Sequence, residues 1–283
     1  MKKIIVIGSS NIDMVVRTSH LPAPGETILG GEFFMNQGGK GANQAVAVKR
    51  LGGNLIFVAK LGNDILGQQS VDYFKKEGID TKYITLDENS ASGANMLLNE
   101  QDVDKVVEEM CEGDILLMQL EIPIQTVEYA ARRAFEKGVK VVLNPAPARS
   151  LPKELLRYLF MITPNRIEAE MLTGIKIVND ADAERVAKEI SAMGVQNIIV
   201  TLGSKGCLVR EGDTSYCVDA FKVEPVDTTA AGDTFNGALC VGLAEGMNLR
   251  QSAGMASKAS SVAVTRMGAQ SSIPYRKELD LNE

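Results

Sequence analysis

Short, almost wholly apolar runs alternate with amphipathic segments along most of the chain, and this alternation strongly constrains the fold. The runs KIIVIG, GDILLMQ, KVVLNPA and NIIVTLG have the length and β-branched content of buried strands. The segments between such runs, for example TVEYAARRAFEKG, have helical spacing and end in glycine. This pattern is typical of a parallel sheet covered by helices on both faces. We therefore expect one α/β domain over residues 1–283, three-layered and doubly wound.

Residues 13–36 depart from this pattern. They alternate polar and apolar side chains around a Pro-Ala-Pro-Gly turn, which suits an antiparallel ribbon with one face in solvent. We expect the ribbon to project from the α/β body as a small β lid over a site. Ligands of open α/β sheets bind outside the carboxyl ends of the strands, so the residues that follow each strand are the candidate site.

Charge and composition argue against several classes of function. The chain has a net charge of −6 and no Lys/Arg cluster longer than a pair, which disfavours nucleic acid or an anionic membrane as a partner. No apolar run approaches the roughly 18 residues of a membrane span. The apolar run at the N-terminus is too short for a signal peptide, so we expect a soluble, cytoplasmic protein.

Histidine and cysteine are too few for most metal and nucleophilic chemistry. His20 is the only histidine, so a Ser-His-Asp triad or a multi-histidine zinc site is not expected. Cys111, Cys207, Cys217 and Cys240 form no CxxC pair, and we expect buried free thiols. Proton transfer would then fall to a carboxylate or a lysine.

Polar residues follow the first expected strand and open the first expected helix. Asn11 and Asp13 in GSSNID suit a polar ligand, although turn capping explains them equally well. GSSNID also lacks the glycine fingerprint of a dinucleotide fold. In NQGGKGANQAVA, the glycines let a ligand approach the backbone, and Asn43 with Gln44 suggests donors facing a sugar. Lys40 is not a P-loop lysine, because no Ser or Thr follows it.

Three later strand ends carry candidate residues. Glu121 follows LLMQL, and residues 201–206, TLGSKG, form a glycine turn that could contact a nucleotide. Asn165 and Glu168 are spaced to share one face of a helical first turn. Glu168 could simply favour the helix dipole. Alternatively, the pair could hold Mg²⁺ through waters.

The stretch TTAAGDTFNG, residues 228–237, places small residues and one carboxylate at a helix start. Small residues leave the first N–H groups of the helix free to bind an anion. A lone aspartate such as Asp233 usually caps a helix. Beside an anion hole it could instead take a proton from an attacking alcohol. Agreement among five strand ends favours phosphoryl transfer to an alcohol.

Together these motifs resemble the ribokinase family of carbohydrate kinases. GGKGANQA and DTTAAGDTFNG match its two signatures, and GSSNID, LPAPGET, MQLE, TPNRIEAE, TLGSKG and VTRMGAQSSIP match in the family's order. The resemblance implies ATP-dependent phosphorylation of D-ribose at its 5-hydroxyl, with Mg²⁺ accompanying ATP and K⁺ as the activating cation. The exposed face of the lid ribbon suggests a homodimer. A kinase of another sugar or of a nucleoside, or a non-catalytic binding paralogue, is the alternative.

The resemblance also implies roles for individual positions. Asp233 matches the catalytic base, and Ala230, Ala231 and Gly232 match the anion hole. The positions that match the sugar site are Asn11, Asp13, Gly38, Gly39, Lys40, Asn43 and Glu121. Those that match the nucleotide site are Asn165, Thr201, Gly203, Ser204, Gly206, Gly232 and Ser257, the last replacing a frequent Asn. Glu168 matches a magnesium-linked acid that acts through water. The positions of the potassium loop are Asp227, Thr229, Ala263, Arg266, Gly268 and Ser272.

The stretch ENSASGANMLLNEQDV departs from the family, in which Ser-Gly begins further lid strands. Here a helix is expected almost immediately. Two strands and a turn need about a dozen residues, so a lid segment is expected to be missing between Gly93 and Asn95. The remaining lid would comprise residues 13–36 and about 90–98. Either the segment is unobserved, which an intact mass well above 30.5 kDa would reveal, or a natural deletion leaves the site open.

Overall fold

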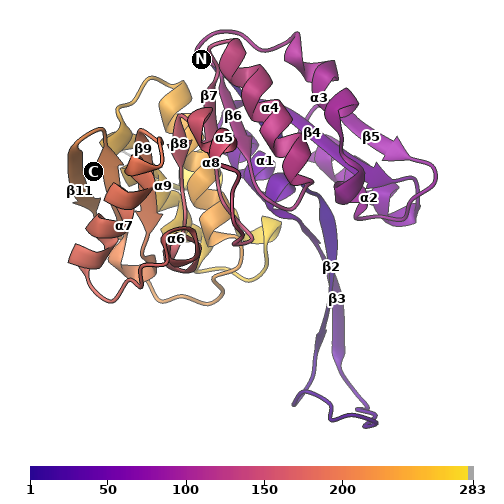
Figure 1. Cartoon of the computed structure of the whole chain (residues 1–283). Coiled ribbons are helices and arrows are strands. Elements are labelled where there is room, and N and C mark those ends of the chain that lie inside the picture. Colours follow the sequence, from indigo (N-terminus) through magenta and orange to yellow (C-terminus); the bar gives the residue numbers. More distant parts are fainter. Residues whose placement is uncertain (280–283) are drawn as a thin grey trace.

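A nine-stranded sheet forms the body of the molecule in this computed structural model, which describes residues 1–279 (Figure 1). Its strands are β1 (Lys3–Ile7), β4 (Asn54–Gly62), β5 (Ile84–Asp87), β6 (Ile115–Met118), β7 (Lys140–Leu143), β8 (Met161–Ile162), β9 (Asn197–Thr201), β10 (Cys207–Glu211) and β11 (Thr214–Val218). The strand order is β11-β10-β9-β8-β7-β6-β1-β4-β5. Pairing is parallel from β9 to β5, whereas β10 is antiparallel to both its neighbours.

Helices cover both faces of this sheet, as the sequence predicts. One face carries α1 (Lys40–Arg50), α2 (Ile65–Lys76), α8 (Ala231–Ala244) and α9 (Leu249–Ala263). The other carries α3 (Glu100–Val107), α4 (Ile124–Glu136), α5 (Lys153–Arg157), α6 (Arg166–Thr173) and α7 (Asp180–Ala192). Successive side chains of a strand point to opposite faces, so Ile4 and Val6 join one core while Ile5 and Ile7 join the other. Within residues 1–279, no helix is both long and apolar enough to cross a membrane.

The edge of the sheet differs most from the sequence-based expectation. The hairpin of β10 and β11 and the short strand β5 were not predicted. Strands β5 and β11 are partly exposed edges without a clear apolar run, whereas β10 is buried and was overlooked. All four cysteines are free, but Cys111 and Cys217 are exposed, so the expectation that all are buried is wrong. Cys217 lies on edge strand β11, where Tyr216 and Val218 point into the core and Cys217 points away from it.

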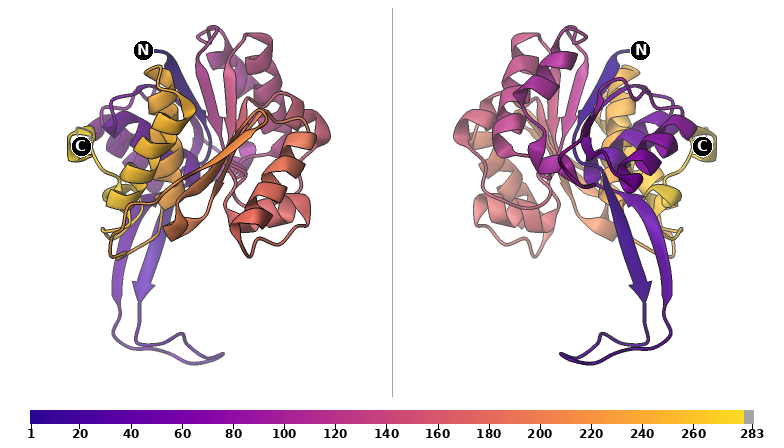
Figure 2. Two further views of the ribbon diagram at one scale, coloured as in Figure 1. Left: turned by 90° about the vertical axis from the view of Figure 1, so that its left-hand side faces the viewer. Right: turned by 90° about the vertical axis from the view of Figure 1, so that its right-hand side faces the viewer.

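A two-stranded antiparallel ribbon projects from the body beside the carboxyl end of β1 (Figures 1 and 2). It consists of β2 (Asn11–Arg17) and β3 (Glu32–Gly38), so an antiparallel ribbon forms where residues 13–36 predict one. One face of the ribbon carries four exposed apolar side chains, between 47% and 59% exposed: Met14, Val16, Phe33 and Met35. We call this set the apolar lid face.

Residues 90–98 add no strand to the ribbon. The chain runs continuously through Gly93, Ala94 and Asn95 without a strand. The chain passes from Gly93 into a short 3₁₀ helix, η1 (Ala94–Leu97), which packs against β4 of the body. Asn95 is buried there and accepts a hydrogen bond from the Ser10 N–H at 2.9 Å. The lid of this chain is therefore the two-stranded ribbon alone.

Candidate active site

Asp233 lies in the first turn of α8 and is only 6% exposed. Asn43 Nδ2 donates to its Oδ2 and Gln44 Nε2 to its Oδ1, each at 2.9 Å, so both carboxylate oxygens are anchored by α1. The hydrogen bonds of this carboxylate run to another helix, which is not the arrangement of a helix cap. Burial raises the pKa of Asp233, while the charge of Lys40 and the two amide hydrogen bonds oppose that rise. Such an environment suits a group that exchanges a proton.

The start of α8 leaves backbone N–H groups available to an anion. Ala230, the residue before the helix, has φ of 59°, the only positive value at a non-glycine residue among residues 1–279. Backbone strain of this kind persists where the surrounding structure imposes it, commonly at functional sites. The N–H groups of Gly232 and Asp233 make no hydrogen bond within the described residues. A Cβ built on Gly232 would meet none of their atoms within 4 Å, so the space beside these groups is open.

The glycines around the start of α1 are required by the packing of the chain itself. A Cβ on Gly38 would lie 2.3 Å from Asp13 Oδ2, and one on Gly39, where φ is +86°, would lie 2.8 Å from Asn11 N. A Cβ on Gly41 would lie 2.5 Å from the Gly8 carbonyl carbon. Each glycine therefore makes room for the chain's own atoms, because α1 begins against the connection between β1 and β2.

Polar groups from three connections gather beside Asp233. Glu121 Oε2 accepts from Ser9 Oγ at 2.5 Å and from the Lys40 backbone N–H at 3.0 Å. Burial, and then the negative charge of Glu121, raise the pKa of Asp13. Asn43 Oδ1 is buried and has no hydrogen-bond partner in the described part of the chain. An acceptor left in this way can receive a hydroxyl group of a ligand.

Some members of this cluster were missed by the sequence analysis, and one was assigned the wrong partner. Ser9 and Asn95 were not singled out, yet Ser9 bonds to Glu121 and Asn95 Nδ2 donates to Asn11 Oδ1 at 2.6 Å. Their only signal is that they stand in the motifs GSSNID and SGAN. Gln44, expected to face a sugar, is fully buried and faces Asp233.

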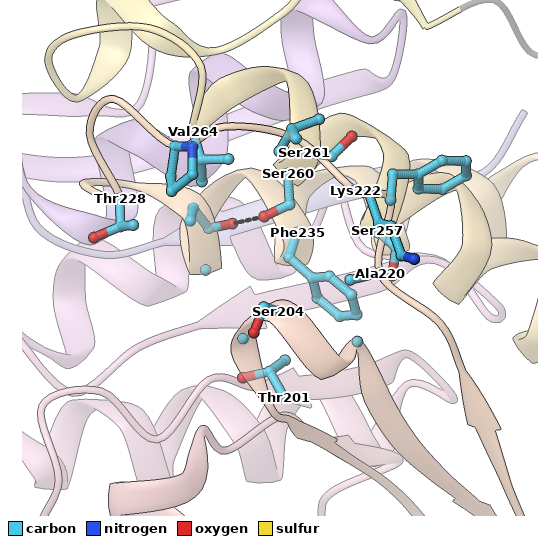
Figure 3. A pocket seen from close by; sticks show the side chains of 17 residues that line it. Thr201, Ser204, Ala220, Lys222, Thr228, Phe235, Ser257, Ser260, Ser261 and Val264 are labelled. Atoms are coloured by element: carbon cyan, nitrogen blue, oxygen red, sulfur yellow. Dashed lines mark hydrogen bonds between the residues drawn. The ribbon is translucent and has the colours of Figure 1, made fainter.

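A cavity of about 450 Å³ opens beside the free N–H groups of α8. Figure 3 shows Thr201 and Ser204 on one side of it and Ser257, Ser260 and Ser261 of α9 on the other. Gly203 and Gly206, together with Ala231 and Gly232, also line it. Gly206 must be glycine, because a Cβ there would lie 2.0 Å from the Val218 carbonyl oxygen. The cavity thus brings the 201–206 turn and the start of α8 around one space.

Known proteins match the chain over nearly its full length. A model of the pfkB family carbohydrate kinases matches residues 1–114 and 107–276. A ribokinase of Haemophilus influenzae is 41% identical over 296 residues, which cover 98% of this chain and 97% of that protein. The chain belongs to the pfkB family, and within it to the ribokinases.

Two further ribokinase-family similarities bear on fold and substrate. A structure of Arabidopsis thaliana ribokinase complexed with ribose and ATP superposes with a TM-score of 0.90 at 29% identity, covering 98% of this chain and 97% of that one. A deoxyribokinase of Salmonella typhi is 33% identical over 304 residues, covering 99% of each protein. The alignment with the Haemophilus ribokinase spans 296 positions, more than the 283 residues of this chain. That relative therefore has residues that this ribokinase lacks.

Kinases use Mg²⁺ with the phosphates of ATP, and Glu168 was the residue expected to serve it. Glu168 is 6% exposed, and burial raises the pKa of its carboxyl group. Its Oε2 accepts from the Asn165 backbone N–H and its Oε1 from Asn165 Nδ2, both at 2.8 Å. These bonds form a capping box at the start of α6, a structural role that the sequence analysis did not predict for Glu168. With both oxygens already bonded, Glu168 fits Mg²⁺ through water.

The residues expected to form a potassium loop lie where two connections of this ribokinase meet. Asp227 Oδ1 accepts from Thr229 N at 2.9 Å and from Thr229 Oγ1 at 2.7 Å, while Oδ2 accepts from Gly268 N at 2.9 Å. These hydrogen bonds lower the pKa of Asp227, so its carboxylate stays charged. The Ala263 carbonyl and Ser272 Oγ, which donates to Ala269 O at 2.7 Å, add oxygen atoms nearby in sequence. A charged carboxylate where two connections meet suits a hard cation.

Proposed function

We propose that this ribokinase transfers the γ-phosphate of ATP to the 5-hydroxyl of D-ribose, giving ribose 5-phosphate, with Asp233 as the general base. The observation that carries the proposal is the arrangement at the start of α8. The buried carboxylate of Asp233, anchored by two amides, follows Gly232, beside which the space is open. The backbone N–H groups of both residues make no hydrogen bond among the described residues. A base and an anion hole in contact are what phosphoryl transfer to an alcohol requires.

In the proposed reaction, Asp233 takes the proton of the hydroxyl as its oxygen attacks the γ-phosphorus, and the bond to ADP breaks. The N–H groups of Gly232 and Asp233 stabilise the negative charge on the transferring phosphoryl group. The sugar is held by Asn11, Asp13, Gly39, Asn43 and Glu121, among the residues assigned above. ATP occupies the 450 Å³ cavity, with Asn165 at the neighbouring turn. Mg²⁺, held through water near Glu168, would supply positive charge to the phosphates.

We also propose that the ribbon of β2 and β3 closes over the bound sugar and excludes water, which would otherwise compete for the phosphoryl group. The Asp227 loop would bind K⁺ and thereby order the approach to the anion hole. The expected compartment is the cytoplasm, where ATP is available and where free thiols persist.

The first test is ADP release with ATP and Mg²⁺ on a panel of sugars and nucleosides, with and without K⁺. Ribose should give the highest kcat/KM, and K⁺ should raise the turnover. Highest turnover on another member, such as deoxyribose, would keep the mechanism and change the substrate. That alternative is supported by the similarity to a deoxyribokinase. No turnover on any member of the panel would overturn the proposal. It would favour a non-catalytic binding protein in which Asp233 transfers no proton.

A second copy of the chain is the expected partner of the apolar lid face. Four exposed apolar side chains on one ribbon are a self-complementary surface for a two-fold interface. Light scattering should give twice the 30.5 kDa of one chain. Phe33→Lys should shift this mass to that of one chain, whereas Ile65→Lys, an exposed apolar residue on α2, should not. A monomeric unmutated protein would contradict the expectation.

A further inference from the structure

A row of buried side-chain amides runs from the ends of β6 and β7 to the carboxylate of Asp233. Gln119 Nε2 donates to Gln44 Oε1 at 2.5 Å. Gln44 Nε2 donates to Asp233 Oδ1 at 2.9 Å and to Asn144 Oδ1 at 3.1 Å. Gln44 and Gln119 are fully buried, and Asn144 is 6% exposed. The amide of Gln44 therefore donates two hydrogen bonds and accepts one within the protein. No donor of this amide is left to contact a ligand directly.

The surrounding structure holds this row by packing at the Gln119 end, where Gln119 Oε1 has no hydrogen-bond partner among the described residues, and by hydrogen bonds at the Asn144 end. A Cβ at Gly8 would lie 2.1 Å from Gln119 Oε1, so glycine at the end of β1 is what leaves room for the Gln119 amide. At the other end, Asn144 Nδ2 donates to the Thr163 carbonyl oxygen at 3.2 Å. Thr163 Oγ1 donates to Asn236 Oδ1 at 2.6 Å.

The same network of hydrogen bonds also reaches Gly232, whose backbone N–H belongs to the proposed anion hole at the start of α8. Asn236 Nδ2 donates to the Gly232 carbonyl oxygen at 2.8 Å. Residues just beyond the ends of β6, β7 and β8, together with Gln44 on α1, are therefore joined to both the carboxylate of Asp233 and the peptide of Gly232. Buried polar networks of this kind, when their members are bonded to one another, hold their groups in a single arrangement.

We propose that Gln44 is a positioning residue for Asp233: held by Gln119 and Asn144, its amide fixes the carboxylate in one orientation and favours its charged form. The proposal rests on the role of Asp233 as the base. A carboxylate that has lost a proton accepts hydrogen bonds more strongly than a protonated one, so a donated N–H stabilises the form that can take the proton from the sugar.

The charged groups around Asp233 determine the direction of the expected effect. Lys40 at the start of α1 lowers the pKa of Asp233, whereas burial, the largest cause, and the charge of Glu121 raise it. Burial, the largest cause, raises the pKa of Glu168 on α6, and the negative charge of Asp233 raises it as well. With the pKa already raised, loss of the Gln44 hydrogen bond should raise it further, so the base would become protonated at a higher pH.

The experiment is the pH dependence of kcat/KM for ribose in the full chain. Gln44→Met keeps the length of the side chain but removes its donors. It should move the acid limb upward by about one to two pH units, since a hydrogen bond to a charged group stabilises it by that equivalent. Ribose affinity, measured by calorimetry, should change less than about threefold. Gln119→Met, which leaves Gln44 present but frees its oxygen, should shift the limb in the same direction by less.

A matched control separates positioning from stability. Asn197 on β9 is 7% exposed, and its Nδ2 donates to the Phe160 carbonyl oxygen at 2.9 Å, away from this network. Asn197→Ala should lower Tm and leave the acid limb in place. If Gln44→Met folds and the acid limb of its kcat/KM profile does not move, the proposal is overturned. If Gln44→Met does not fold, the acid limb of Gln119→Met decides between the two outcomes. Near-normal activity of Asp233→Asn would instead show that Asp233 is not the base. That result would overturn the proposed function and is distinguishable from a failure of the Gln44 proposal alone.

Discussion

Asp233→Asn should lower kcat for ribose by at least about 10² to 10⁴, the contribution typical of a general base. The asparagine keeps the size of the side chain and can still accept from Asn43 or Gln44, but it cannot take a proton. The change should appear in kcat rather than in the affinity for ribose, because proton transfer belongs to the reaction step. ADP release at saturating ribose and ATP measures it.

Asp182→Asn is the matched control for this substitution. Asp182 occupies the same position in the first turn of α7 as Asp233 does in α8, and it accepts from the Asn179 backbone N–H at 3.2 Å. Loss of this carboxylate should alter only local helix stability and leave turnover unchanged. If Asp233→Asn were as active as this control, Asp233 would have no role in the chemistry.

The pH dependence of the Tm of the Asp233→Asn protein should distinguish loss of the base from misfolding. Burial raises the pKa of Asp233 in the folded state, so its contribution to stability is complete below the unfolded pKa and is lost as pH rises through the folded pKa. Asparagine carries no charge to bury. The Tm of the variant relative to that of the unmutated protein should therefore rise between pH 3 and pH 8, on top of a constant loss from the asparagine NH2, which faces an amide donor. A difference in Tm that does not change with pH would contradict this account.

Gly232→Ala should lower kcat/KM for ATP by a factor of the order of 10², the cost of disturbing a single oxyanion contact. Nothing in the described residues lies within 4 Å of the added methyl group, so the folded protein itself accepts it. The methyl group would instead occupy the space that we assign to the transferring phosphoryl group. Steady-state kinetics with varied ATP measures the loss.

The same substitution should leave stability unchanged or raise it by up to about 1 kcal/mol, because alanine favours a helix over glycine. Gly254→Ala is the control, since Gly254 lies within α9 and its Cβ would also meet nothing within 4 Å. That variant should gain similar stability and keep full activity. Equal activity of the two variants would show that no phosphoryl group approaches Gly232.

Much of the fold could be predicted from the sequence because its signals are local. The alternation of apolar runs with amphipathic segments predicts the central parallel strands and their helices. Residues 13–36 have the polar and apolar alternation of a ribbon, and they form one. The edge strand β11 was missed because its side chains are mostly partly exposed and carry no clear periodicity, whereas β10 is buried and its short apolar run CLV was overlooked.

Some residues of the candidate site could likewise be predicted from local sequence, whereas the contacts of others depend on the tertiary structure. Asp233, Gly232 and the 201–206 turn could be singled out from motifs, since small residues before a helix and glycine after a strand are local features. The three glycines at 38, 39 and 41 were also evident, but their reason was not. Gly39 and Gly41 make room for backbone atoms between the end of β1 and the start of β2, and Gly38 makes room for the Asp13 side chain on β2; these contacts depend on how α1 docks against the sheet.

Asn43 and Gln44 illustrate most clearly what sequence alone determined. Their polar side chains at the start of an apolar helix predicted hydrogen-bond donors facing a polar ligand such as a sugar. Only the tertiary structure decided that both amides meet a carboxylate about 190 residues later in the chain and that Gln44 also joins Asn144 and Gln119. The physical reason is that a buried amide must find hydrogen-bond partners, and folding supplies them from segments that no local pattern connects.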